Sequence, residues 1–160
     1  PVAENLIDNY KLNNNSKILD IGCGKAFLLF EIKKILPEIK ICGLDHSEYA
    51  INNSKEEIRK NLLVHKAETP IPFSDKEFDL VFSLNTLHNL KIYELETALK
   101  EMQRVGKNGY LCLESFRNDQ ELFNLECWAL TCQSFYTPDE WEWIYNHFGY
   151  SGDYEFIYFE

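Results

Sequence analysis

The chain has 160 residues, 45% of them hydrophobic and 26% charged, and its net charge at neutral pH is −10. This size and composition are typical of one globular domain and exclude a disordered chain, so we expect a single domain over residues 1–160. The acidic charge repels phosphate backbones and anionic lipid, and no apolar run is long enough to span a bilayer. We therefore expect neither a nucleic-acid partner nor a membrane partner.

The five cysteines indicate a reducing compartment. Their number is odd and most lie in apolar, strand-like runs, which is typical of buried thiols in a cytosolic protein. The closest pair, Cys127 and Cys132, does not have CxxC spacing, and no second group of ligands follows it. We expect a cytoplasmic protein without a metal site.

Short apolar runs that indicate buried strands alternate with segments whose apolar residues recur at helical spacing. Pro37 ends the first helix, and Ser47 is a suitable N-cap for the second. Residues 137–140 (TPDE) form a capping box with proline in the first turn. The predicted strands are Lys17–Ile21, Ile39–Asp45, Leu62–His65, Phe78–Ser83, Tyr110–Glu114 and Tyr154–Phe159. The predicted helices are Phe27–Leu36, Ser47 to Arg59, Ile92–Val105, Asn118 to Cys132 and Thr137 to His147.

Alternating strands and helices imply right-handed crossovers and a mostly parallel sheet with helices on both faces. We therefore predict an α/β fold, a Rossmann-like doubly wound sheet. In such a sheet the ligand binds at the carboxyl ends of the strands, where the strand order reverses. The residues that follow each strand are thus the candidates for a site.

Two glycines, Gly22 and Gly24, follow the first strand. Glycine allows a tight turn and a close approach of the backbone to a ligand, and the next helix offers free N–H groups at its start. A structural turn without a ligand would have the same residues. A dinucleotide fingerprint, GxGxxG, needs a third glycine where this chain has Phe27. This difference disfavours a nicotinamide-dependent oxidoreductase.

Asp45 ends the second strand, 21 residues after Gly24. A carboxylate at this place can accept hydrogen bonds from both hydroxyls of a ribose, and charge-assisted bonds of this kind are strong. The alternative is a residue that only starts the next helix, but Ser47 already supplies that cap. The spacing favours ribose binding.

Four stretches resemble successive motifs of the UbiE or "type 11" group of class I S-adenosylmethionine-dependent methyltransferases. They are KILDIGCG, GLDHS, KAETPIPFSDKEFDLVFSLNTLHNL and ALKEMQRVGKNGYLCLE, and they cover about residues 15–115. The glycine loop is similar to the DxGxGxG motif of this family, with Ala26 in place of the last glycine. The resemblance implies S-adenosylmethionine as cofactor and in-line methyl transfer to a small-molecule acceptor.

The resemblance also implies nine cofactor-binding residues, all at or just after the ends of the first four strands. They are Asp20, Gly22 and Gly24 around the methionine part, Asp45 at the ribose, His46 against the adenine face, Ala67 and Glu68 at the adenine edge, and Leu84 and Asn85 on the methionine side.

The acceptor side has fewer candidates. His88, which follows the fourth strand, is the candidate general base, since an imidazole titrates near neutral pH; it could instead cap the next helix. Trp128 and Tyr136 follow the fifth strand, where relatives often build the acceptor pocket, and we expect them to contact the acceptor. A sugar hydroxyl, a quinone-like ring and a small amine are all compatible acceptors.

The chain differs from the family pattern at both ends. Only about 15 residues precede the first strand, and one strand follows the last helix where the common sheet has two. The acceptor pocket would then be more open than usual, or completed by a second copy in a homodimer. Ala26 and the altered adenine segment, residues 66–68, also favour an alternative, a non-catalytic module that binds S-adenosylmethionine.

Overall fold

The computed structural model describes residues 1–160 and contains one six-stranded sheet in the order β3-β2-β1-β4-β5-β6. All neighbouring strands are parallel, so the predicted Rossmann-like α/β fold is confirmed. The strand order reverses between β1 and β4, which places their carboxyl ends at the ligand edge of the sheet. The strands are β1 Lys17–Ile21, β2 Lys40–Asp45, β3 Leu62–Val64, β4 Phe78–Leu84, β5 Gly106–Glu114 and β6 Asp153–Ile157.

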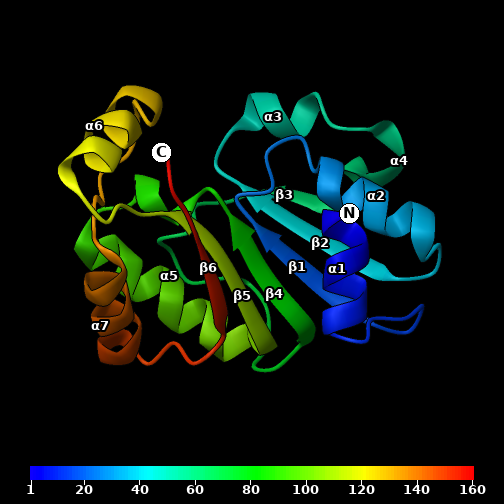
Figure 1. Cartoon of the computed structure of the whole chain (residues 1–160). Coiled ribbons are helices and arrows are strands. Elements are labelled where there is room, and N and C mark those ends of the chain that lie inside the picture. Colours follow the sequence, from blue (N-terminus) through cyan, green and yellow to red (C-terminus); the bar gives the residue numbers. More distant parts are fainter.

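Helices lie on both faces of the sheet (Figure 1). In this view α1 and α2 lie in front of the sheet, α5 and α7 lie behind it, and α6 lies near the carboxyl ends of the strands. None of the helices is both long and apolar enough to cross a membrane. The helices are α1 Val2–Asn9, α2 Phe27–Ile35, α3 Glu48–Asn52, α4 Glu56–Arg59, the 3-10 helix η1 Leu87–Asn89, α5 Ile92–Val105, α6 Asp119–Trp128 and α7 Pro138–Phe148.

Local signals in the sequence predict most helix starts correctly. The Ala50 amide donates to Ser47 Oγ at 3.1 Å, and the Thr137 amide donates to the carboxylate of Glu140 at 2.8 Å. Both caps satisfy amides that the first turn of a helix leaves without partners. Gly149, with φ +76°, ends α7 in the left-handed conformation.

Three predicted elements differ from the structure by more than two residues. The helix predicted from Ser47 to Arg59 is two short helices, because the Ser54 hydroxyl donates to the Ile51 carbonyl and ends the first. Helix α6 ends at Trp128, so Cys132 lies outside it. Strand β5 begins at Gly106 rather than Tyr110, since Gly106 already pairs with Phe78 of β4. The start of β5 depends on pairing between strands, which a local pattern does not show.

The sheet is packed on both faces by buried apolar side chains. Between the sheet and α5 and α7 lie Val81, Leu99 and Trp141; between the sheet and α1 and α2 lie Leu29 and Phe82. Each such side chain contributes roughly 1.5–3 kcal/mol when it is fully buried. Helix α1, which the sequence analysis does not predict, buries Ala3 and Leu6 in the second layer. This packing fixes the strand ends that form the site.

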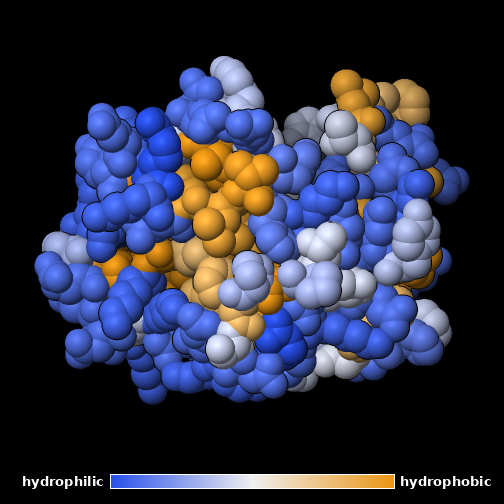
Figure 2. Space-filling model, turned by 180° about the vertical axis from the view of Figure 1, so that it is seen from behind, coloured by the Kyte–Doolittle hydropathy of each residue, from blue (hydrophilic) through white to orange (hydrophobic).

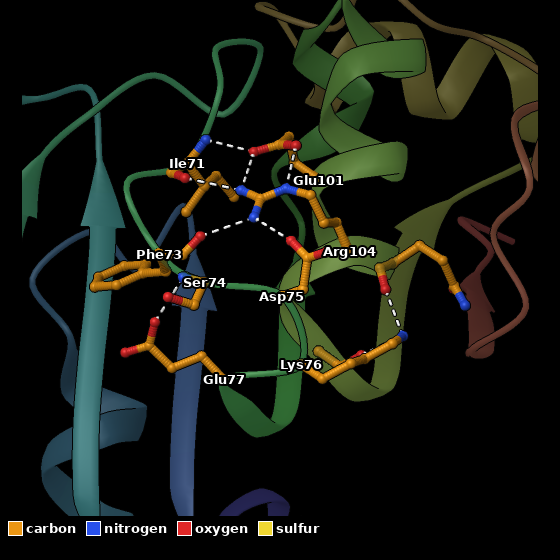
Figure 3. Close-up of polar contacts among 10 residues, drawn as sticks. Ile71, Phe73, Ser74, Asp75, Lys76, Glu77, Glu101 and Arg104 are labelled. Atoms are coloured by element: carbon orange, nitrogen blue, oxygen red, sulfur yellow. Dashed lines mark hydrogen bonds and ion pairs between the residues drawn. The ribbon is translucent and has the colours of Figure 1, made fainter.

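The connection between β3 and β4, residues 65–77, contains no helix and is bound to α5 by Arg104 (Figure 3). The guanidinium donates to the Ile71 carbonyl at 2.9 Å and to the Phe73 carbonyl at 2.8 Å. It also bonds Asp75 and Glu101, and Glu101 accepts from the Ile71 amide. Figure 2, which shows the molecule from behind, has an apolar area surrounded by hydrophilic surface.

Replacing Arg104 by lysine should destabilise the protein by about 2–3 kcal/mol. Lysine keeps the charge but lacks the planar guanidinium with its several N–H donors. Carbonyls of the 71–73 segment therefore lose their hydrogen-bond donors. Urea unfolding measures the loss. The matched control is Arg117→Lys, because the side chain of Arg117 is 47% exposed and forms ion pairs with Glu121 and Glu160. That variant should lose less than about 1 kcal/mol. Equal losses of stability in the two variants would show that the guanidinium geometry of Arg104 is unimportant.

Candidate active site

The loop between β1 and α2 forms the centre of the ligand edge. The amides of Gly22 and Cys23 both donate to the Leu44 carbonyl on β2, at 2.7 and 2.9 Å. Gly22 has φ +79°, and a Cβ there would lie 2.2 Å from the Thr86 side chain. Gly24 has φ +55°, and no atom lies within 4 Å of the place of its missing Cβ. The loop therefore leaves free space beside its second glycine.

Asp45 lies at the end of β2 and faces this loop. Its Oδ2 accepts from the Gly24 amide and its Oδ1 from the Ser47 amide, both at 2.8 Å. His46 Nδ1 lies 3.8 Å from Asp45 Oδ1, and the His46 side chain is largely exposed. The carboxylate thus joins the glycine loop to the start of α3.

Asp20, near the end of β1, is a buried acid without a hydrogen-bond donor from the rest of the chain. Burial raises the pKa of its carboxyl group to about 8, and the nearby charge of Asp45 adds to the rise. A cationic group of a ligand would favour the ionised form. Asp20 is therefore a suitable counter-charge for a cationic cofactor.

A cavity of about 430 Å³ opens at this edge, a volume typical of a small-molecule site. Neither Lys25 nor Phe27, the bulky residues of the glycine loop, borders the cavity. Five of the nine predicted cofactor-binding residues border it: Gly22, Asp45, His46, Ala67 and Glu68.

The other four predicted cofactor residues do not border the cavity. Asp20, in β1, and Gly24, in the loop, are each two positions from Gly22. Leu84 packs against the core cluster next to α1 and α2. Asn85 is exposed with φ +51°, and its amide donates to the Cys112 carbonyl at 2.9 Å.

The predicted acceptor residues do not border the cavity. His88 is 4% exposed, and its Nδ1 contacts a carboxylate oxygen of Glu114. Trp128 is on the outer part of α6, 54% exposed, with its ring 4.8 Å from that of Phe159. Tyr136 packs edge-on against Trp141 of α7. The structure therefore does not bring these two aromatic side chains to the cavity.

Three polar residues that the sequence does not indicate as site residues also border the cavity. Asn89 lies in η1, and Thr131 and Gln133 lie in the segment that returns from α6 to α7. The Thr131 hydroxyl donates to Asn89 Oδ1 at 2.7 Å, and the Gln133 amide donates to the His88 carbonyl at 2.9 Å. The quoted NTLHNL motif contains Asn89, whereas no local pattern indicates Thr131 or Gln133.

The fold and the cavity define a class I methyltransferase domain, and the comparisons agree. A family model described as a methyltransferase domain matches residues 12–149, so the chain belongs to this family. S-adenosylmethionine is the methyl donor of this family.

Similar proteins carry methyltransferase names. YrhH of Bacillus subtilis, named as a methyltransferase, is 31% identical over 104 residues, which are 62% of this chain and 57% of that protein. Demethylmenaquinone methyltransferase of Listeria welshimeri is 31% identical over 105 residues, 62% of this chain and 44% of that protein. The structure of YcgJ from Bacillus subtilis superposes with a TM-score of 0.71 at 17% identity, covering 91% of this chain and 66% of that one. The predicted UbiE-like resemblance is confirmed, and the chain spans about half the length of these two relatives.

The residues present fit this cofactor. The free space beside Gly24, the carboxylate of Asp45 and the buried acid of Asp20 suit a ligand with a ribose and a cationic end. No group of three or more His, Cys, Asp or Glu side chains is placed to hold a metal ion.

Replacing Asp20 by asparagine should stabilise the protein without cofactor at alkaline pH. The pKa of Asp20 rises from 3.8 to about 8 on folding, so the native state binds this proton more tightly than the unfolded state. The free energy of unfolding then falls as the pH rises from about 4 to about 8. Asp20→Asn lacks this pH-dependent loss. Its free energy of unfolding relative to the wild type should therefore increase by more than about 1 kcal/mol between pH 5 and pH 8.

Urea unfolding at both pH values measures this advantage. Asp79 is the matched control, since a hydrogen bond from Lys107 lowers its pKa and its ionised form stabilises the fold. Asp79→Asn should therefore destabilise the protein near neutral pH. An advantage of Asp20→Asn that did not depend on pH would contradict the ionisation argument.

Proposed function

We propose that the protein transfers a methyl group from S-adenosylmethionine to a small molecule bound in the same cavity. The observation that carries this proposal is the composition of the cavity wall. Gly22 and Asp45, at the ends of β1 and β2, border the same cavity as Asn89 of η1 and Gln133 of the segment between α6 and α7. One cavity can thus hold donor and acceptor together, and orienting two reactants contributes roughly 7–11 kcal/mol to a reaction.

When bound, the cofactor supplies a methyl group on a positively charged sulfur. In this proposal Asp45 holds the ribose hydroxyls, Ala67 and Glu68 border the adenine, and His46 lies against its face. Asp20, Gly22 and Gly24 hold the methionine part, with Leu84 and Asn85 on its other side. The polar groups of Asn89, Thr131 and Gln133 orient the acceptor, and His88 is the candidate base.

A small molecule is a better acceptor than a nucleic acid for this chain. The net charge of −10 opposes binding of a phosphate backbone. Asp45, Glu68 and Glu94 border the cavity, against one lysine, Lys66. Such a wall favours a neutral or cationic acceptor over an anionic one.

We also propose a cytoplasmic location and a homodimer. Five free cysteines support a cytoplasmic protein, since they suit a reducing compartment. A homodimer would complete the open acceptor side; sedimentation of a fully active monomer would contradict it.

Calorimetric titration with S-adenosylmethionine, followed by a product assay over sugars, hydroquinones and small amines, tests the proposed function. We expect binding and methylation of at least one acceptor. Ala26 has φ +57°, an unfavourable conformation for alanine in place of the family's glycine. This departure favours the second candidate, a non-catalytic module, which would bind the cofactor without methylating any acceptor. Absence of cofactor binding would overturn both.

A further inference from the structure

His88 and Glu114 form a buried polar pair beside the proposed acceptor site. Their side chains are 5% and 0% exposed, and His88 Nδ1 contacts Oε2 of Glu114. Neither Nδ1 nor either carboxylate oxygen has another partner in the chain. A buried charge without further hydrogen bonds is costly, and such groups are frequent at functional sites.

The fold brings these two residues together from separate strand ends. His88 lies in η1, which follows β4, and Glu114 is the last residue of β5. The amides of Gln133 and Ser134 donate to the His88 carbonyl at 2.9 and 3.0 Å. Gln133 and the residue after His88, Asn89, border the cavity. The pair therefore lies directly behind the acceptor wall.

The chemistry of the contact determines which nitrogen of the ring is protonated. An ionised carboxylate only accepts hydrogen bonds, so Nδ1 carries the proton that faces Glu114. The Nε2 atom then has the lone pair of the neutral ring. Only Nε2 can accept a further proton.

We propose that Glu114 is a positioning residue that holds His88 with Nε2 ready to deprotonate the acceptor. This inference rests on the proposed function. In the reaction the acceptor atom forms a bond to the methyl carbon, and the carbon–sulfur bond breaks with its electron pair remaining on sulfur. The acceptor's proton passes to Nε2, and Glu114 stabilises the resulting imidazolium. Atoms and charge balance without a further reactant.

Two thiols are the other titratable groups near the pair. Cys112 lies on the same strand as Glu114, and Cys132 lies in the segment after α6; the charge of Glu114 acts on both. Burial raises the pKa of each thiol to about 11. Both thiols are therefore uncharged near neutral pH, so neither provides a negative charge that could stabilise the imidazolium in place of Glu114.

The first test is the NMR spectrum of the ring in ¹⁵N-histidine-labelled protein saturated with S-adenosylhomocysteine, which needs no acceptor. We expect His88 protonated at Nδ1 in the wild type. In Glu114→Gln the ring should populate both tautomers, because a neutral amide can donate to Nδ1 as well as accept from it. Glu121→Gln is the matched control, a buried carboxylate paired with Arg117 on α6. It should leave the His88 signals unchanged.

A wild-type ring protonated at Nε2, or a ring in Glu114→Gln that keeps the wild-type tautomer unchanged, would overturn the inference. The second test uses any acceptor that the product assay shows to be methylated. Glu114→Gln should lower kcat at least about tenfold and His88→Gln should lower it about 100-fold, and the KM for the cofactor should change little in both variants. Unchanged kcat in Glu114→Gln would refute the positioning role and leave the methyltransferase proposal standing, whereas loss of cofactor binding by the wild type would refute that proposal itself.

Discussion

Gly22→Ala should destabilise the protein by about 3 kcal/mol or more and abolish measurable binding of the cofactor. At φ +79° an alanine is strained by roughly 1–2 kcal/mol. Its Cβ would also lie 2.6 Å from the Cβ of Thr86, an atom that rotation of the side chain cannot move away. The Thr86 backbone must therefore shift, and overpacking of this kind costs about 1–3 kcal/mol more.

Gly24→Ala introduces the same kind of backbone strain as Gly22→Ala but no contact with another side chain. Gly24 also has a left-handed backbone, φ +55°, but no atom lies within 4 Å of its ideal Cβ. In the same loop Ala26 already adopts φ +57°. We expect Gly24→Ala to lose only about 1 kcal/mol in urea unfolding. If both variants lost the same free energy, the contact with Thr86 would not be the cause.

Thr86 explains why the glycine loop and the segment after β4 act together. Its hydroxyl donates to the Leu84 carbonyl at 3.0 Å and to the Gly22 carbonyl at 3.3 Å. Thr86 and Gly22 both border the cavity. A shift at position 22 would therefore move both the cofactor loop and the wall that carries Asn89.

Local patterns in the sequence predict the parts of the site that one segment can specify. Gly22, Gly24 and Asp45 follow buried apolar strands, and parallel strands bring their carboxyl ends to one edge. The cap at Ser47 is equally local, since the side chain and the amide that it accepts from are three residues apart. These features depend on neighbours in the chain and can be inferred without a structure.

The acceptor side could not be predicted in the same way. His88 contacts Glu114 across 26 positions, and Thr131 bonds Asn89 across 42. The helical pattern of the 118–132 segment favours a helix through Cys132, yet the chain leaves the helix after Trp128 and returns over the cavity. Such contacts depend on tertiary packing, which overrides weak local preferences.

Asp45→Asn should weaken the binding of S-adenosylmethionine by about 10- to 100-fold. The substitution removes the negative charge and one of two acceptor oxygens, and charge-assisted hydrogen bonds contribute about 1.5–3 kcal/mol each. Isothermal titration calorimetry at fixed ionic strength measures the change. Asparagine also keeps only one oxygen for the amides of Gly24 and Ser47, which Asp45 binds at 2.8 Å. Some stability will therefore be lost together with affinity.

Ser47→Ala distinguishes ribose binding from a role of Asp45 in starting α3. It removes the hydroxyl that accepts from the Ala50 amide, which costs about 1 kcal/mol of stability. It leaves the Asp45 carboxylate and its bond to Gly24 in place. We expect the affinity of Ser47→Ala for the cofactor to stay within about twofold of the wild type, a change below about 0.5 kcal/mol. Comparable losses of affinity in both variants would mean that Asp45 acts on the helix start; a loss confined to Asp45→Asn would mean that its carboxylate binds the cofactor.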